Sequence, residues 1–242
     1  MLDETKRIKK LSVEIEEMSR MECFSDEWLG KAKNIILELK DIYEKRFVGV
    51  SGIFARIKRY LFGNKRSAYG KFYKNVIMSG KYGIKFEDGI LQNINVSSVT
   101  RFFNLLSDTC KNSKSVLYML SQSVKKLVSA MVNNKNEFIL KNLYKIGSKA
   151  ENIFYDFLKN HTISIKSVSD LMEFDYNEIS RFAGSFDTSP KIKDLLECSG
   201  VIVMELNNLV IYFQSDNTTL MEESIKLLKE KISKFGDLMK KE

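Results

Sequence analysis

The sequence has very few of the residues that break helices, cross-link chains or bind metals. Its 242 residues include one proline, Pro190, one histidine, His161, and three cysteines. Because proline ends helices and is excluded from central strands, its near absence permits long uninterrupted helices. A single histidine excludes metal sites built from several imidazoles. Cys23, Cys110 and Cys198 are too few and too far apart to form a disulfide framework, so they predict a reducing compartment.

Long apolar runs are also missing. The longest, 201–204 and 209–213, are far shorter than the roughly 20 residues that a helix needs to cross a bilayer. The chain carries charged residues from Asp3 onward, which a signal peptide would not. These patterns predict a cytoplasmic protein that does not cross a membrane.

No motif for a nucleotide, a cofactor or a catalytic metal is present. Gly63 and Gly70-Lys71 resemble part of a phosphate-binding loop, but six residues separate the glycines, and Phe72 stands where Ser or Thr should hold magnesium. A lone histidine beside a short strand is more often structural than catalytic. One acidic cluster is explained as readily by helix capping and solubility as by metal binding. Its members are Asp170, Glu173, Asp175 and Glu178. We therefore predict that the protein is not an enzyme and has no cofactor or metal.

Apolar residues recur at helical spacing through residues 1–135. The first predicted helix, 3–21, has Ile8, Leu11, Ile15 and Met18 on one stripe. A second helix follows the N-cap Ser25, and further helices are predicted at 98–111 and 114–132. Residues 83–96 read as strand or loop, with short alternating runs on either side of a Glu87-Asp88-Gly89 turn signal. This part of the chain is predicted to be a helical body.

The pattern changes in residues 136–242, where we predict a smaller α+β unit. After a helix at 136–159 come a short strand at 162–165, a helix at 168–174, a turn at 175–177 and helices at 178–186 and 190–196. Residues 201–213 are predicted to form a β-hairpin through Asn207-Asn208, and 219–240 a long C-terminal helix. The order of these elements is that of a winged helix. The predicted fold is therefore mainly α, with a winged-helix-like C-terminal unit.

The charge is concentrated in one segment. The net charge is +8, and residues 45–85 hold 11 basic and no acidic side chains. Aromatic residues are interleaved with them throughout. Lysine and arginine neutralise phosphates, and exposed aromatic rings can stack on bases, so the segment predicts nucleic-acid binding, to DNA or RNA. The predicted binding residues are Arg56, Lys58, Arg59, Lys65, Arg66, Lys71 and Lys74.

Two other interpretations of this segment remain open. A basic amphipathic helix with Phe54, Leu61 and Phe62 on its apolar side would suit an anionic membrane surface, as in a peripheral scaffold or adaptor. Alternatively, the aromatic residues belong to the core and the charges form a solvated face. Acidic residues outnumber basic ones in 162–215, which disfavours DNA binding by the winged-helix-like unit and favours protein contacts there.

The C-terminal helix has a continuous apolar seam with coiled-coil-like spacing. We expect this seam to be buried, either against the preceding hairpin or against the same helix of a second copy in a homodimer. Its residues are Met221, Ile225, Leu228, Ile232, Phe235 and Met239.

Overall fold

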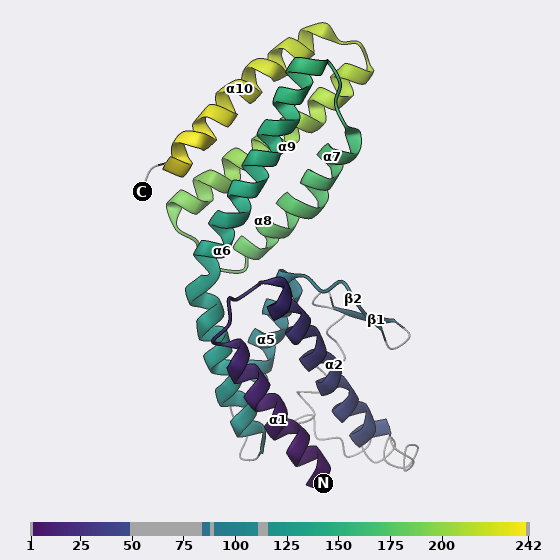
Figure 1. Cartoon of the computed structure of the whole chain (residues 1–242), viewed down its shortest axis with the longest axis vertical. Helices are drawn as coiled ribbons and strands as arrows, with labels where there is room; N and C mark the ends of the chain where they lie inside the picture. The colour runs from purple at the N-terminus through teal and green to yellow at the C-terminus, as the bar shows by residue number, and fades with distance from the viewer. Residues whose placement is uncertain (1, 49–83, 88–89, 111–115, 241–242) are drawn as a thin grey trace. The chain divides into compact units, whose positions relative to one another are not determined.

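The computed structural model describes residues 2–48, 84–87, 90–110 and 116–240. The chain folds into two compact units, Met1–Asn134 and Lys135–Glu242 (Figure 1). Within the described residues the fold is mainly helical, with one small two-stranded sheet, which confirms the predicted class in its coarse form.

The first unit contains helices α1 (Leu2–Met18), α2 (Asp26–Val48) and α5 (Val96–Cys110), and the beginning of α6 (Val116–Asn160). The predicted stripe of α1 is buried, as are the inward-facing residues of α5. Helix α2 begins as the sequence indicated, because Ser25 Oγ accepts a hydrogen bond from the Trp28 amide at 3.3 Å. Trp28 then packs edge-on against Phe103 of α5, with ring centroids 6.3 Å apart.

Strands β1 (Lys85–Glu87) and β2 (Ile90–Gln92) pair antiparallel in the region predicted to be strand or loop, with Phe86 opposite Leu91. A reciprocal cap then starts α5. The Ser98 amide donates to Asn95 Oδ1 at 2.8 Å, and the Asn95 amide donates to Ser98 Oγ at 3.1 Å. Two of the four amides that lack an intrahelical partner at this helix end are thereby satisfied.

An ion triad joins α1 to α2. The Arg7 guanidinium donates to Glu38 Oε1 and to Asp41 Oδ2, each at 2.6 Å. Burial alone would lower the pKa of Arg7, but the hydrogen bonds from Arg7 to Asp41 and Glu38 outweigh it and raise the pKa. Arg7 therefore holds two carboxylates of α2 against α1 with a charge that persists at any physiological pH.

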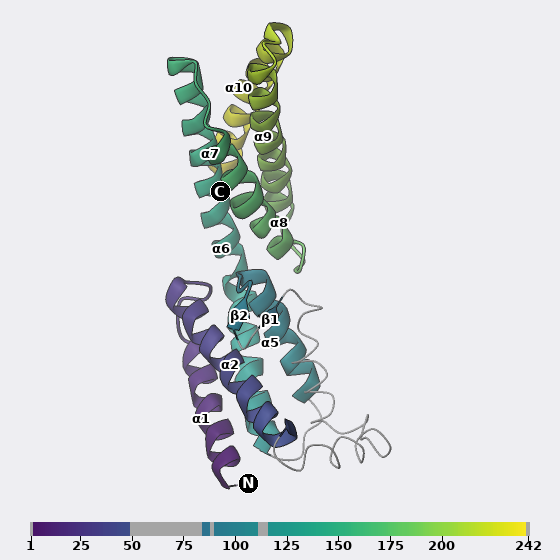
Figure 2. The same ribbon diagram turned by 90° about the vertical axis from the view of Figure 1, so that its right-hand side faces the viewer.

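The second unit is an up-and-down helical bundle (Figures 1 and 2). The end of α6 is followed by α7 (Ile165–Asp170), the π-helix η2 (Leu171–Tyr176) and α8 (Asn177–Ala183), which run on without a break. Helix α9 (Pro190–Gln214) and helix α10 (Thr218–Lys240) then lie side by side as an antiparallel pair. Each helix buries one apolar face in a common core.

The predicted β-hairpin at 201–213 is wrong, because these residues belong to α9. The N-cap Ser189 accepts from the Ile192 amide at 3.4 Å and Pro190 takes the first helical position, so the helix starts well and continues for 25 residues. Its buried residues recur every three or four positions, which is the helical period. Asn207-Asn208 lacks the glycine that most two-residue hairpins use, and Asn208 instead bonds Glu205 one turn earlier.

The other predictions for this region need similar corrections. The strand at 162–165 is absent, because Ser164 caps α7 by accepting from the Ser167 amide at 3.2 Å. The turn at 175–177 lies instead within continuous helix, and the helices at 114–132 and 136–159 are one helix, α6. No strand occurs among residues 135–240, so the predicted α+β unit and its winged-helix order are replaced by a helical bundle.

Contacts between polar groups set the register of α9 against α10. Ser224 Oγ donates to Glu205 Oε2 at 3.1 Å, and Cys198 Sγ lies 3.4 Å from the Lys231 carbonyl oxygen, to which it donates. Phe235 of α10 also reaches α6, where it lies against Gly147. The seam of the C-terminal helix is therefore covered by helices of its own unit.

We expect Gly147→Ala to destabilise the second unit although alanine favours helices. A Cβ at this position would overlap the buried Phe235 ring, and overpacking of this kind costs about 1–3 kcal/mol. Gly236→Ala is the matched control, since a Cβ there meets no atom within 4 Å and should stabilise α10 by about 1 kcal/mol. Urea unfolding followed by circular dichroism measures both, and an equal response of the two variants would contradict this packing.

Candidate functional site

The seven basic residues predicted to bind nucleic acid lie between α2 and β1, outside the described residues. Some basic residues of the first unit that are described already have partners. Lys40 of α2 places its ammonium 4.5 Å from the centre of the Phe86 ring on β1. Lys85, which precedes Phe86 in this strand, is exposed.

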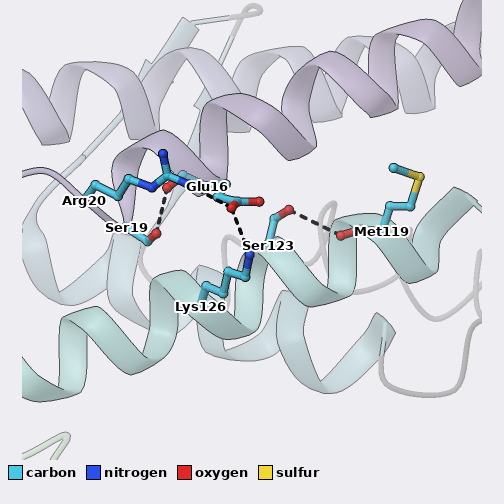
Figure 3. Close-up of polar contacts among 6 residues, drawn as sticks. All are labelled: Glu16, Ser19, Arg20, Met119, Ser123 and Lys126. Atoms are coloured by element: carbon cyan, nitrogen blue, oxygen red, sulfur yellow. Dashed lines mark hydrogen bonds and ion pairs between the residues drawn. The ribbon is translucent and has the colours of Figure 1, made fainter.

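Lys126 of α6 is also engaged within the unit (Figure 3). Its Nζ donates to Glu16 Oε1 of α1 at 2.8 Å, and Arg20 donates to the same oxygen at 3.1 Å. The pKa of Glu16 is held below its ordinary value, chiefly by the hydrogen bond from Lys126 and then by the positive charge of Lys126. These groups join α1 to α6, so this basic side chain serves the packing of the first unit.

His161 and the acidic cluster, the other candidate site residues in the sequence, make contacts that stabilise the fold. His161 follows α6 with a φ of 50°, and its amide donates to the Phe157 carbonyl at 2.9 Å, as in a left-handed helix cap. In the acidic cluster, Asp175 accepts from Lys149 Nζ at 2.7 Å and thereby links η2 to α6. Among the described residues, no group of three or more His, Cys, Asp or Glu side chains lies close enough to hold a metal ion.

The seam of α10 lies mostly inside its bundle. Leu228 and Phe235 are buried, whereas Met221, Ile225, Ile232 and Met239 are half-buried. The burial that the seam required is thus supplied by helices of the same unit, and the partner is α9 where a hairpin had been predicted.

A surface that the sequence reasoning missed lies where α7 and η2 run beside α9. Six large apolar side chains of these elements are exposed to water, among them Phe174 of η2 by 64% and Phe213 of α9 by 36%. The other four are Ile165, exposed by 55%, Met172 by 39%, Met204 by 55% and Ile211 by 51%. We call these four residues the α7–α9 face. The prediction of strands at 201–213 hid this face, because only a helix places residues seven apart, such as Met204 and Ile211, on the same side.

The register between the two elements brings these four residues together. Tyr176 Oη donates to the Leu196 carbonyl oxygen at 3.3 Å, and the absence of a side chain at Gly200 makes room for the Tyr176 hydroxyl. Counting away from this contact along antiparallel helices puts Met172 level with Met204, and Ile165 level with Ile211. The four exposed side chains therefore lie at matching levels of two neighbouring elements.

Helix α9 is also unusual in its composition. Among the described helices, α9 is long and apolar enough to cross a membrane, judged by length and composition alone. In this fold, 44% of its most apolar stretch is buried within the protein.

Comparison with known proteins does not add an assignment. The chain matches no protein-family model, and neither a curated protein nor a solved structure was found to be similar to it.

The three cysteines are expected to react slowly with thiol reagents in the native protein. Burial raises the pKa of Cys110 to about 12 and also raises the pKa of Cys23 and Cys198. A raised pKa leaves less of the reactive thiolate at about pH 8, and the side chains are buried as well. Absorbance after addition of a disulfide reagent, with and without denaturant, measures this. Labelling of the native protein as fast as that of the unfolded chain would contradict it.

Proposed function

We propose that this protein binds nucleic acid without catalysing a reaction, and that segment 45–85 carries the binding residues. The observation that supports the proposal is the composition of this segment, which holds 11 basic and no acidic side chains and interleaves them with aromatic residues. Counterion release from phosphates favours binding of such a segment to a polyanion. Its aromatic rings favour nucleic acid over other polyanions, because bases can stack on them.

The charge distribution elsewhere supports a division of roles between the two units. Residues 161–242 hold 10 basic and 14 acidic side chains, so this part of the chain would be repelled by phosphates. Its polar surface mixes both signs, which suits contacts with protein. Since the seam of α10 packs within its own bundle, we propose protein contacts for other surfaces of the second unit and no coiled coil through α10.

The proposal predicts nucleic-acid binding that weakens steeply with salt. Neutralisation of about five phosphates gives a slope of about −4 to −5 for the logarithm of affinity against the logarithm of salt concentration on duplex DNA. Five basic residues are changed to serine in the test variant, and its binding should be lost. They are Arg56, Lys58, Arg59, Lys65 and Arg66.

A matched control removes the same number of charges elsewhere. Its five lysines are exposed, lie outside segment 45–85 and are also changed to serine: Lys125, Lys145, Lys159, Lys226 and Lys229. Fluorescence anisotropy with labelled DNA and RNA oligonucleotides measures both variants, and circular dichroism checks their fold. Equal losses in the two variants would mean that net charge alone is responsible, and the assignment to this segment would be wrong.

The alternative is that the segment binds an anionic membrane surface, as in a peripheral scaffold. Its basic residues and the apolar side chains Phe54, Leu61 and Phe62 motivate this alternative. Co-sedimentation with phosphatidylserine vesicles separates the two. Binding to vesicles with no binding to any nucleic acid at low salt would replace the proposed function by this one.

A further inference from the structure

We infer that the α7–α9 face binds a second copy of this chain, so that the protein is a two-fold symmetric homodimer. The inference concerns the second unit alone and does not depend on nucleic-acid binding. It rests on three observations about the outward side of α9: large apolar side chains are exposed there, charged side chains are almost absent, and the residues follow a coiled-coil-like spacing.

The C-terminal half of α9 has no charged side chain that lacks a partner within the unit. Residues 198–215 include one charged side chain, Glu205, although 29% of the residues in the chain are charged. The Glu205 carboxylate is used inside the unit, where it accepts from Ser224 Oγ and from Asn208 Nδ2, both at 3.1 Å. The centres of protein interfaces are depleted of charge in this way, whereas ordinary solvated helix faces are not.

The side chains on this face are those that interfaces favour. Met172 and Met204 are exposed at the same level of the two elements, and methionine is enriched at interfaces because its flexible thioether adapts to a partner. Ile165 and Ile211 lie two helical turns further along the same elements. Exposed apolar residues shared by two neighbouring elements mark a contact surface more strongly than isolated exposed residues do.

The spacing on α9 identifies the partner as a helix with the same pattern. Val201, Met204, Asn208 and Ile211 follow one another at intervals of 3, 4 and 3, which is the seam of a two-stranded helical contact. A charged partner would lose its hydration against this uncharged side of α9 without gaining an opposite charge there. Helix α9 of a second copy offers an equally uncharged side, and the amide groups of the two Asn208 side chains can donate to and accept from each other.

The available area indicates a weak dimer. Residues 198–215 span about 25 Å of helix, and α7–η2 runs beside them at about 8–10 Å. Together they offer on the order of 600 Å² per copy, somewhat below the roughly 800 Å² per partner of a standard interface. We therefore expect a monomer–dimer equilibrium and no permanent dimer.

Sedimentation velocity over a range of protein concentrations, without nucleic acid, tests the inference directly. The wild-type protein should shift from monomer to dimer as concentration rises. The double variant Met204→Glu/Ile211→Glu should remain monomeric, because two desolvated carboxylates per copy oppose association. Tyr155→Glu is the matched control: Tyr155 is 53% exposed, belongs to α6 and is not one of the four residues of the face, so the variant should leave the equilibrium unchanged.

Cross-linking provides a second measurement. In Met204→Cys and Asn208→Cys, mild oxidation should yield a disulfide-linked dimer from at least one variant, whereas Tyr155→Cys should not. The native cysteines do not interfere, since all three are buried. A wild-type protein that stays monomeric at every concentration overturns the inference. So does a dimer that survives the double substitution while circular dichroism shows both proteins folded.

Discussion

The structure depends on the continuity of helix α6, whose 45 residues form one helix from Val116 to Asn160. Its sequence has no proline, and its first glycine is Gly147, so nothing in the backbone interrupts it. A helix of this length exposes an apolar stripe that must be covered along its whole extent. Its beginning supplies core residues to the first unit and its end supplies them to the second. They are Leu120, Val124, Leu127 and Met131, then Ile139, Leu143, Ile146, Ala150, Phe154 and Phe157.

Sequence reasoning succeeded where the apolar residues of an element fall on one stripe, and it failed where they occur on several sides of a helix. Helices α1, α2, α5 and α10 and the β1–β2 hairpin follow from stripes, caps and turn residues that can be read directly. Helix α9 contacts α10 on one side and α7–η2 on another, and it also exposes Met204 and Ile211, so its apolar residues show no single stripe in the sequence although its buried residues keep the helical period. Runs such as Val201–Met204 then resemble strands, and length and the Ser189-Pro190 start were the better guides.

The two proposed surfaces differ in how far the sequence reveals them. A basic segment is visible in composition, because charge can be counted without knowing the fold. The α7–α9 face cannot be found by counting, since its four residues come from two segments and share a side only when 201–213 is helical. Their level is set by the contact of Tyr176 with the Gly200 turn of α9, which is a packing property that no local pattern records.

The two proposals reinforce each other physically although they rest on separate residues. A homodimer carries two copies of segment 45–85, and a polyanion held by the first copy becomes an intramolecular target for the second. Affinity for nucleic acid would then depend on the α7–α9 face without any phosphate contact there. By linkage, a nucleic acid that spans both segments must favour dimer formation by the same factor by which dimer formation favours nucleic-acid binding. A weak dimer is well suited to this coupling, because an equilibrium near balance responds to a modest difference in affinity, whereas a permanent dimer could not respond at all.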